Sequence, residues 1–283
     1  MSLFFLSPIL LMVGIVTICL RGRRRYGPPV TDRLLRSPGE SLRKKIDTLD
    51  DKFLETLLWT LFFGPVCYLL FSIAWQHRMT RVFYIELAML AVFALGGFIF
   101  LAVRTVDAIR ERSDYMLGFS GERAVGEELS KLMLDGCQVF HDFPGGLNWN
   151  IDHIVVAPSG IYVIETKTRR KKKAPRGNRK YEINCDGESL EPPHDKSLEQ
   201  AKRNAKSLSG FLSDATGEKI WVTPILTFPG WFVVQRGKPN PYWAVLNHKQ
   251  IRGYVIGRPT KLTPQRIQQI AHQLDQKCRD VEF

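Results

Sequence analysis

Cysteine is scarce and scattered in this sequence of 283 residues. The five cysteines are Cys19, Cys67, Cys137, Cys185 and Cys278, and no two of them form a CxxC pair. A structural zinc site or a disulfide framework needs cysteines at characteristic spacings, so neither is expected here. Scattered reduced thiols fit a domain that lies in the cytosol.

Glycine-rich phosphate-binding motifs are also missing. Neither a GxGxxG nor a Walker A sequence occurs, so a nucleotide-binding fold has no support. No internal repeat is visible. Acidic residues are fewer than basic ones, 28 against 40, which leaves a net charge of +12.

Long hydrophobic runs are present, and they gather in the first part of the chain. Residues 3–20 and 57–75 carry no charge, and residues 82–103 contain a single charged residue, Glu86. About 20 apolar residues suffice to cross a bilayer. The first run does not look like a signal peptide, because no basic residue precedes it and no A-x-A site follows. The sequence therefore predicts a membrane region with three transmembrane helices in residues 1–112.

Basic residues predict how these helices are oriented. The sequence RGRRR follows the first run, which predicts that the loop 21–53 is cytoplasmic. The short link QHRMTR, residues 76–81, predicts a tight hairpin between the second and third runs. An outside N-terminus followed by three spans places residues 113–283 in the cytosol. We therefore expect a multi-pass protein of the inner, cytoplasmic membrane.

The cytosolic part alternates helical and strand-like patterns. Helices are predicted at 120–134, with Ser120 as N-cap, at 197–212 and at 264–278. Strands are predicted at 137–143, in two runs within 151–168, and at 180–184, 220–228 and 241–247. This order predicts an α/β sandwich around a central mixed sheet.

The stretch IDHIVVAPSGIYVIETKT, residues 151–168, predicts a hairpin with charged side chains at its open end. If Pro158 and Ser159 form a two-residue loop, facing residues have numbers that add up to 317, so Asp152 faces Glu165. A three-residue loop shifts this pairing by about one residue. Directly opposed residues have Cβ atoms roughly 4.5–5.5 Å apart. Lys167 shares a strand face with Glu165, because side chains alternate along a strand.

Such a cluster has the parts needed for phosphodiester hydrolysis. Two adjacent carboxylates repel each other unless a cation neutralises them, and Mg²⁺ favours a few carboxylates plus waters. The ion can polarise a phosphoryl oxygen and generate hydroxide from bound water. A nearby lysine can orient that water or stabilise the charge that develops on the phosphate.

The spacing of these residues is similar to that of a known family. Asp152, then twelve residues, then Glu165, Thr166 and Lys167, resembles the PD-(D/E)xK nuclease signature. More specifically, residues 118–230 resemble the NERD (nuclease-related) domain, through GFSGERAVGEEL, IDHIVVAPSGIYVIETKT, LEQAKRNAKSL and PILTF. Two departures stand out: Ile151 replaces the proline of the signature, and a basic run follows where the family often has an aromatic residue and glycine.

This resemblance implies a restriction-endonuclease-like fold and a metal-dependent nuclease. Asp152 and Glu165 would bind Mg²⁺ or Mn²⁺, and Lys167 would be the catalytic lysine. The family also suggests a glutamate on the first helix, for which Glu122 and Glu127 compete. They lie about 140° apart around a helix, and Glu122 is favoured because it shares the face of the apolar residues at positions 125 and 129.

Gln200, Glu122 and His153 each have a second interpretation. Gln200 matches a family glutamine that would orient substrate or water, and a solvated polar side chain is the alternative. Glu122 has an alternative as well, that of an acid favoured by the dipole in the first turn of a helix. His153 points to the strand face opposite to Asp152, so a core histidine is favoured over a ligand.

A basic run, residues 167–180, directly follows the proposed catalytic strand. Its position predicts contacts with nucleic acid. A solvated loop and a loop that contacts anionic lipid headgroups are the alternatives. Trp149, Trp221, Trp231 and Trp243 could stack on bases, although packing is the commoner role of tryptophan. The predicted nucleic-acid-binding residues are Arg169, Arg170, Lys171, Lys172, Lys173, Arg176 and Lys180.

The sequence thus favours a membrane-anchored, Mg²⁺- or Mn²⁺-dependent nuclease, with DNA favoured over RNA as its partner and the lipid bilayer as its support. One alternative is a tethered module that binds nucleic acid or protein without cutting. Another is a membrane scaffold or sensor in which the spans are essential. The oligomeric state and the choice between internal and terminal cleavage are not indicated.

Overall fold

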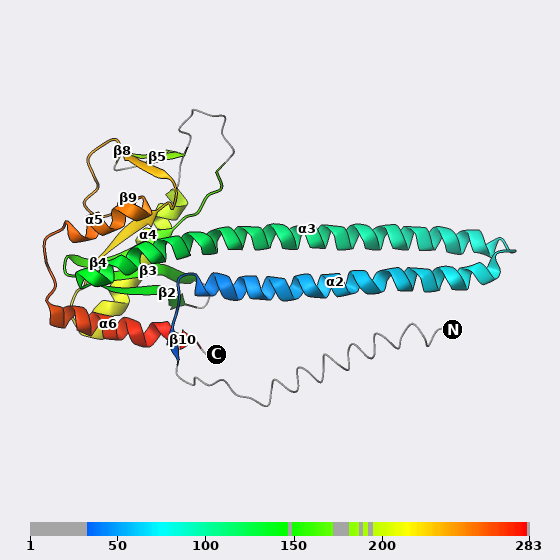
Figure 1. Cartoon of the computed structure of the whole chain (residues 1–283), viewed down its shortest axis with the longest axis horizontal. Coiled ribbons are helices and arrows are strands. Elements are labelled where there is room, and N and C mark those ends of the chain that lie inside the picture. The colour runs from blue at the N-terminus through cyan, green and yellow to red at the C-terminus, as the bar shows by residue number, and fades with distance from the viewer. Residues whose placement is uncertain (1–32, 147–148, 172–180, 187–188, 192–194, 282–283) are drawn as a thin grey trace. The chain divides into compact units, whose positions relative to one another are not determined.

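The computed structural model describes residues 33–146, 149–171, 181–186, 189–191 and 195–281 (Figure 1). The first predicted span, residues 3–20, and most of the basic run lie outside these ranges. The chain divides into two compact units. In the smaller unit the described part is an antiparallel pair of strands, β1 (Leu34–Leu35) and β10 (Arg279–Val281).

The larger unit, residues 36–278, begins with two long helices that form a hairpin. Helix α2 (Glu40–Ala74) and helix α3 (Val82–Ser130) pack along each other and are joined by the 3₁₀ turn η1 (Trp75–His77). Both are long and apolar enough to cross a membrane, by length and composition alone. In the most apolar stretch of each helix, almost no side chain is buried within the described protein. The hairpin predicted around residues 76–81 is confirmed.

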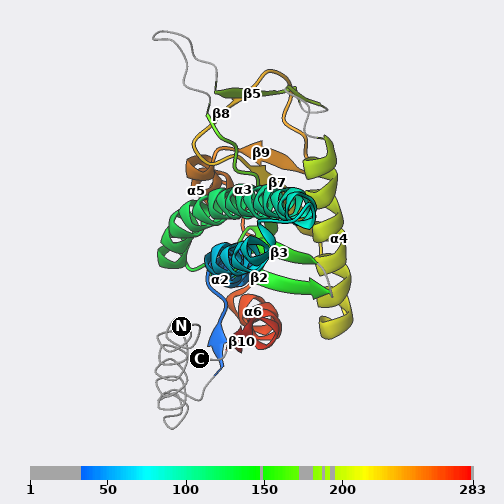
Figure 2. The same cartoon turned by 90° about the vertical axis from the view of Figure 1, so that its right-hand side faces the viewer.

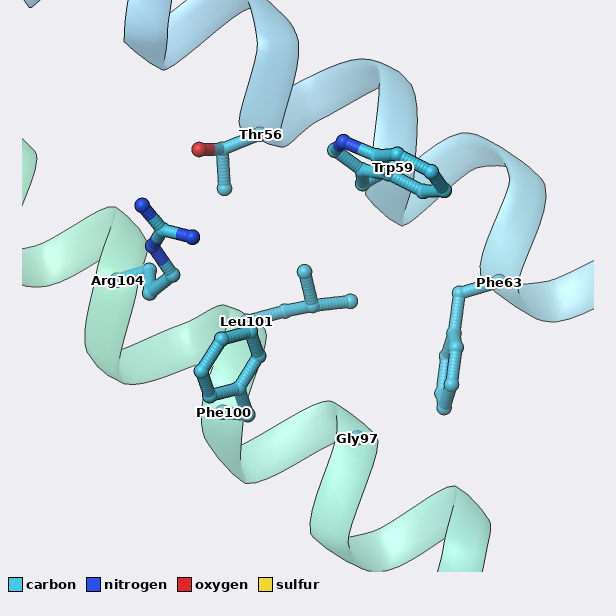
Figure 3. Close-up of a pocket in the computed structure, with 7 residues that line it drawn as sticks. All are labelled: Thr56, Trp59, Phe63, Gly97, Phe100, Leu101 and Arg104. Carbon is cyan, nitrogen blue, oxygen red and sulfur yellow. The ribbon is translucent and has the colours of Figure 1, made fainter.

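Close packing between the two helices depends on a glycine in α3. A side chain at Gly97 would overlap the ring of Phe63 from α2, and Phe63 also packs on Phe93 with ring centroids 5.6 Å apart. Phe63 and Gly97 also line a pocket of about 260 Å³ between the helices, with Thr56 and Arg104 at its other end (Figure 3).

Helix α3 continues without interruption into the α/β part of this unit. The predicted N-cap at Ser120 is therefore wrong: this residue lies inside α3, where its hydroxyl donates to the carbonyl of Leu117 at 2.8 Å. No proline separates the apolar span from the amphipathic segment, so nothing in the backbone stops the helix. The predicted domain boundary at residues 112 and 113 falls within the same helix.

A five-stranded mixed sheet is the centre of the α/β part, in the order β2-β3-β4-β7-β9. Neighbours are antiparallel from β2 to β4 and parallel from β4 to β9. The strands are β2 (Gln138–Gly146), β3 (Trp149–Ala157), β4 (Gly160–Thr166), β7 (Val222–Thr227) and β9 (Ala244–Leu246). The predicted mixed central sheet is confirmed.

The hairpin of β3 and β4 has the register expected for a two-residue loop. Ala157 pairs with Gly160 and His153 pairs with Ile164, and the numbers in each pair add up to 317. Gly160 has φ +144° at the end of the turn, a backbone conformation that glycine adopts without steric cost.

Helices cover both faces of the sheet (Figures 1 and 2). On one face α3 and the short α5 (Ile251–Ile256) pack on a buried cluster that includes Val125, Tyr162 and Ile225. On the other face α4 (Asp195–Thr216) and α6 (Pro264–Cys278) enclose a second cluster. Both helices present strong apolar stripes, so burying them against the sheet removes large apolar areas from water.

A second, smaller sheet lies beside the first and was predicted only in part. Its order is β6-β5-β8, from β5 (Glu182–Cys185), β6 (Leu190–Glu191) and β8 (Phe232–Gln235). The strand predicted at 180–184 corresponds to β5. Strands β6 and β8 and helix α5 were not predicted, because each is too short to show a clear periodicity.

Candidate active site

Asp152 and Glu165 lie at the open end of the β3–β4 hairpin. The observed register places them opposite each other, one step beyond the pair His153 and Ile164. Both side chains are buried. One carboxylate oxygen of Asp152, Oδ2, accepts a hydrogen bond of 2.7 Å from the backbone N–H of Thr166. This bond orients Asp152 and leaves its second oxygen for another partner.

Glu165 is held by two side chains from different parts of the chain. Its Oε1 forms an ion pair with Lys167 Nζ at 2.7 Å, and its Oε2 accepts a hydrogen bond of 3.0 Å from Asn204 Nδ2. Lys167 also donates to Gln200 Oε1 at 3.1 Å. Gln200 and Asn204 are four residues apart on α4, so they share one side of that helix. The structure thus brings the predicted lysine and glutamine together.

Glu122 reaches the same cluster from α3. It is buried, and its Oε2 has no hydrogen-bond partner among the described residues. Its carboxyl group lies within electrostatic range of Glu165 and Lys167. Glu127, the competing candidate, is exposed on the other side of α3. The helical-face argument from the sequence therefore selected the acid that lies beside the site.

Burial and mutual repulsion raise the pKa values of these carboxyl groups. Burial raises the pKa of Glu122 to about 8, and the charges of Asp142 and Glu165 add to the effect. Burial, together with Glu165 and Glu122, raises the pKa of Asp152 well above its usual range. Burial also raises the pKa of Glu165, although Lys167 and Asn204 offset part of the increase. A cluster of this kind gains from an added positive charge.

Lys167 remains a cation in this environment. Burial alone would lower its pKa, but the surrounding carboxylates Glu165, Asp152 and Glu122 outweigh burial and raise the pKa. An ammonium group with a raised pKa does not accept a proton near neutral pH. Lys167 is therefore suited to stabilise negative charge and to donate hydrogen bonds.

The donor set of the cluster fits a hard divalent cation. Carboxylate oxygens are the ligands that Mg²⁺ prefers, and the buried Oε2 of Glu122 lacks a partner in the described chain. Within the described residues, however, no group of three or more His, Cys, Asp or Glu side chains is placed to hold a metal ion by itself. Two carboxylates completed by waters and phosphate oxygens match the usual coordination of Mg²⁺.

The described start of the basic run lies next to this cluster in sequence. Arg170 pairs with Asp114 of α3 at 2.7 Å, and the Nζ atom of Lys171 lies 5.0 Å from the ring centroid of Tyr181. Arg169 is exposed. The remaining predicted nucleic-acid contacts, Lys172, Lys173, Arg176 and Lys180, fall outside the described residues.

His153 lies in the core, as the sequence favoured. It is fully buried, and its Nδ1 atom lies 2.8 Å from Nδ1 of His141 on the neighbouring strand. Burial lowers the pKa of both histidines, that of His141 to about 4. Both rings are therefore neutral at physiological pH.

Three residues that shape the site were not singled out from the sequence. Asn204 holds Glu165, and its position four residues after Gln200 was the available signal. Gly121 lets Thr168 approach α3, because a side chain there would overlap the Thr168 hydroxyl. Asp142 raises the pKa of Glu122 and is itself bound by Ser41 from the start of α2. No local pattern links positions 41 and 142.

The fold and the cluster together define an α/β domain with an acidic site and a lysine suited to chemistry on phosphate esters. Comparison with known families supports this class directly. Residues 117–229 match the family described as "Nuclease-related domain" (NERD). The resemblance predicted for residues 118–230 is confirmed. Neither the curated proteins nor the solved structures include a match to the chain.

Proposed function

We propose that this protein is a membrane-anchored, divalent-metal-dependent nuclease that hydrolyses phosphodiester bonds, with DNA as the favoured substrate. The observation that carries the proposal is the convergence of Asp152, Glu165 and Lys167 at one end of the β3–β4 hairpin, beside Gln200 from α4. The arrangement agrees with the restriction-endonuclease-like fold and the PD-(D/E)xK signature that the sequence resembles. The nuclease-related family of residues 117–229 supports the same class of activity.

Each side chain of the cluster has a distinct role in this proposal. Asp152 and Glu165 would hold Mg²⁺ or Mn²⁺, which would supply Lewis-acid activation of the phosphate and of a water molecule. Lys167, kept as an ammonium group by its carboxylate neighbours, stabilises negative charge on the phosphoryl oxygens. Gln200 orients the Lys167 amine through their hydrogen bond of 3.1 Å. Glu122, whose pKa of about 8 keeps it largely protonated at neutral pH, would add negative charge once a bound cation lowers that pKa.

The membrane part of the proposal is supported by the uncovered apolar surface of α2 and α3. A helix that is apolar on all sides is stable only where apolar material surrounds it. With the second and third spans formed by these helices, the basic residues that follow the first span and the third span favour a multi-pass protein of the inner membrane with the nuclease-related domain in the cytosol.

The test uses the full chain purified in detergent. It is incubated with supercoiled plasmid, linear duplex DNA and single-stranded RNA, each in Mg²⁺, Mn²⁺ or EDTA. We expect cutting that requires a divalent ion and is lost in Asp152→Ala. Retention of a wild-type far-ultraviolet circular dichroism spectrum by the variant controls for misfolding. Cutting that persists in EDTA, or in the variant, would contradict the proposal.

The second candidate is a module that binds nucleic acid or protein without cutting. Its supporting observation is the direct ion pair between Lys167 and Glu165, which partly satisfies the carboxylate without a metal. Under this alternative, binding is the same in Mg²⁺ and EDTA, and no substrate is cut. The third possibility, a scaffold in which the spans are essential, predicts that Lys167→Ala leaves cellular function intact.

A further inference from the structure

A second pocket, of about 470 Å³, lies on the other flank of α4 from the carboxylate cluster. It is bounded by α4, by the start of β7 and by the segment 240–243. Successive residues of a helix are about 100° apart. Gln200, which faces the cluster, and Lys202, which lines the pocket, therefore lie on nearly opposite sides of α4.

Aromatic rings form much of this pocket. Trp221 and Tyr242 are 63% and 64% exposed, and their ring centroids lie 6.2 Å apart in an edge-to-face arrangement. Trp243, which also lines the pocket, is buried, with the Nζ atom of Lys202 5.5 Å from its ring centroid. Large aromatic side chains around a concavity are costly to leave in water, and such exposed groups commonly mark a binding site.

The charge of the pocket is positive. Lys202 and Lys206 line it, and none of the described residues that line it is acidic. Lys202 is paired with Glu199 at 2.9 Å, whereas Lys206 forms no ion pair with any described residue. An occupant that carries both a flat apolar ring and a negative charge complements such a site.

We propose that this pocket, centred on Trp221, Tyr242 and Lys206, binds a single-stranded segment of nucleic acid. Bases stack on the exposed rings of Trp221 and Tyr242, and backbone phosphates lie beside Lys202 and Lys206. Aromatic platforms beside basic side chains bind single strands with little sequence preference, because every base has a stacking face. The inference rests on the proposed function for the class of its ligand.

The surface of α4 connects the pocket to the carboxylate cluster. Its exposed side carries Arg203 and Lys206, and the charge of Arg203 acts on Glu165. Gln200 and Lys206 are separated by about 9 Å along the helix axis. A strand held in the pocket can therefore cross the basic outer side of α4 to reach the cluster. The pocket thus favours substrates with a single-stranded end or flap over blunt duplexes.

The test measures binding by the full chain in detergent and EDTA, so that cleavage does not contribute. Fluorescence anisotropy follows a labelled single-stranded oligonucleotide, with blunt duplex and free nucleoside monophosphate as competitors. We expect Trp221→Leu and Tyr242→Leu to weaken binding about tenfold, within the range of single stacking contacts. Tyr242→Phe keeps the ring and should bind like the wild type. Lys206→Ala should reduce the dependence of log Kd on log salt by about one unit.

Matched controls are Phe232→Leu and Lys261→Ala, an exposed aromatic residue and an exposed lysine outside this pocket. Wild-type affinity in both leucine variants would overturn the proposal. So would equal loss in Tyr242→Phe and Tyr242→Leu, which would indicate a contact of the hydroxyl group. Competition by the free nucleotide at the same concentration as the oligonucleotide would overturn the assignment to a strand.

Failure of the pocket proposal can be distinguished from failure of the proposed nuclease function. If no substrate is cut in Mg²⁺ or Mn²⁺ but the ring variants lose single-strand binding, the nuclease proposal fails and the pocket stands. If Asp152→Ala abolishes cutting while the ring variants bind and cut flapped DNA like the wild type, the pocket fails and the nuclease stands.

Discussion

Glu122 is a buried acid of the candidate site whose ionisation depends on the charges around it. Burial and neighbouring carboxylates raise its pKa from 4.5 to about 8. Because the folded-state pKa is the higher one, the folded protein binds this proton more tightly than the unfolded chain. The contribution to stability is complete below pH 4.5 and is lost as the pH rises through about 8.

Glu122→Gln should therefore become more stable relative to the wild type as the pH rises. In EDTA, we expect the difference in Tm between variant and wild type to grow by about 5 °C from pH 5 to pH 8 and then to level off. Saturating Mg²⁺ should reduce this pH dependence, since a bound cation offsets the carboxylate repulsion. Scanning fluorimetry measures both curves, and a pH-independent difference would contradict the assigned environment of Glu122.

Asn204 acts on the site through Glu165, to which it donates a hydrogen bond of 3.0 Å. Loss of a partner that orients a metal-binding side chain typically costs 10- to 100-fold in activity or metal affinity. We expect Asn204→Ala to lower kcat about tenfold or more, with a smaller effect on KM. Ser207→Ala, an exposed change on the same helix, serves as the control. A wild-type kcat in Asn204→Ala would show that Glu165 needs no such support.

At the scale of elements, the site depends on how closely β4 approaches α3. Gly121 makes this approach possible, because any side chain there would overlap Thr168, which directly follows Lys167. The same long helix therefore carries both the acid Glu122 and the glycine that leaves room for the residues directly after β4. A shift of one element moves the lysine relative to the carboxylates.

Gly121→Ala should lower both Tm and activity, even though alanine favours helix formation. Gly210→Ala is the matched control, since it lies in helix α4 with no atom near the added methyl group. That change should raise stability slightly, by about 0.5–1 kcal/mol at most. Thermal unfolding and plasmid cleavage are measured on both variants. Equal effects of the two substitutions would show that the contact with Thr168 is unimportant.

For the whole molecule, the decisive feature is the hairpin of α2 and α3. Its apolar side chains are uncovered in the described protein, and its tip carries Met79, which is 87% exposed. If the hairpin crosses the membrane and the nuclease-related domain is cytosolic, the tip faces the outside of the inner membrane.

Cysteine labelling tests this orientation. Met79→Cys should react with a membrane-impermeant maleimide in intact spheroplasts, because its side chain lies on the outer side. Lys261→Cys should react only after the membrane is permeabilised, and the wild-type chain reports the background from native cysteines. Labelling of position 261 in intact spheroplasts would place the domain on the other side of the membrane.

Local patterns in the sequence predicted much of the fold. The alternation of β3 and β4 and the Pro158–Ser159 turn predicted the pairing of Asp152 with Glu165, because strand register follows from turn length. The apolar stripes of α4 and α6 predicted their buried faces. The sequence wrongly predicted that the first helix of the α/β part begins at Ser120. The apolar span before Ser120 is already helical, so this residue lies inside α3 and does not cap a helix.

What the sequence by itself determined is therefore the set of elements with strong periodicity, and the acids and lysine on one hairpin. These features depend on backbone geometry over a few residues. Only the tertiary structure decided that Glu122, Asn204 and Gln200 meet around Glu165 and Lys167, and that Trp221 and Tyr242 share a basic pocket. Such contacts join distant segments through packing on the sheet, which no local spacing encodes.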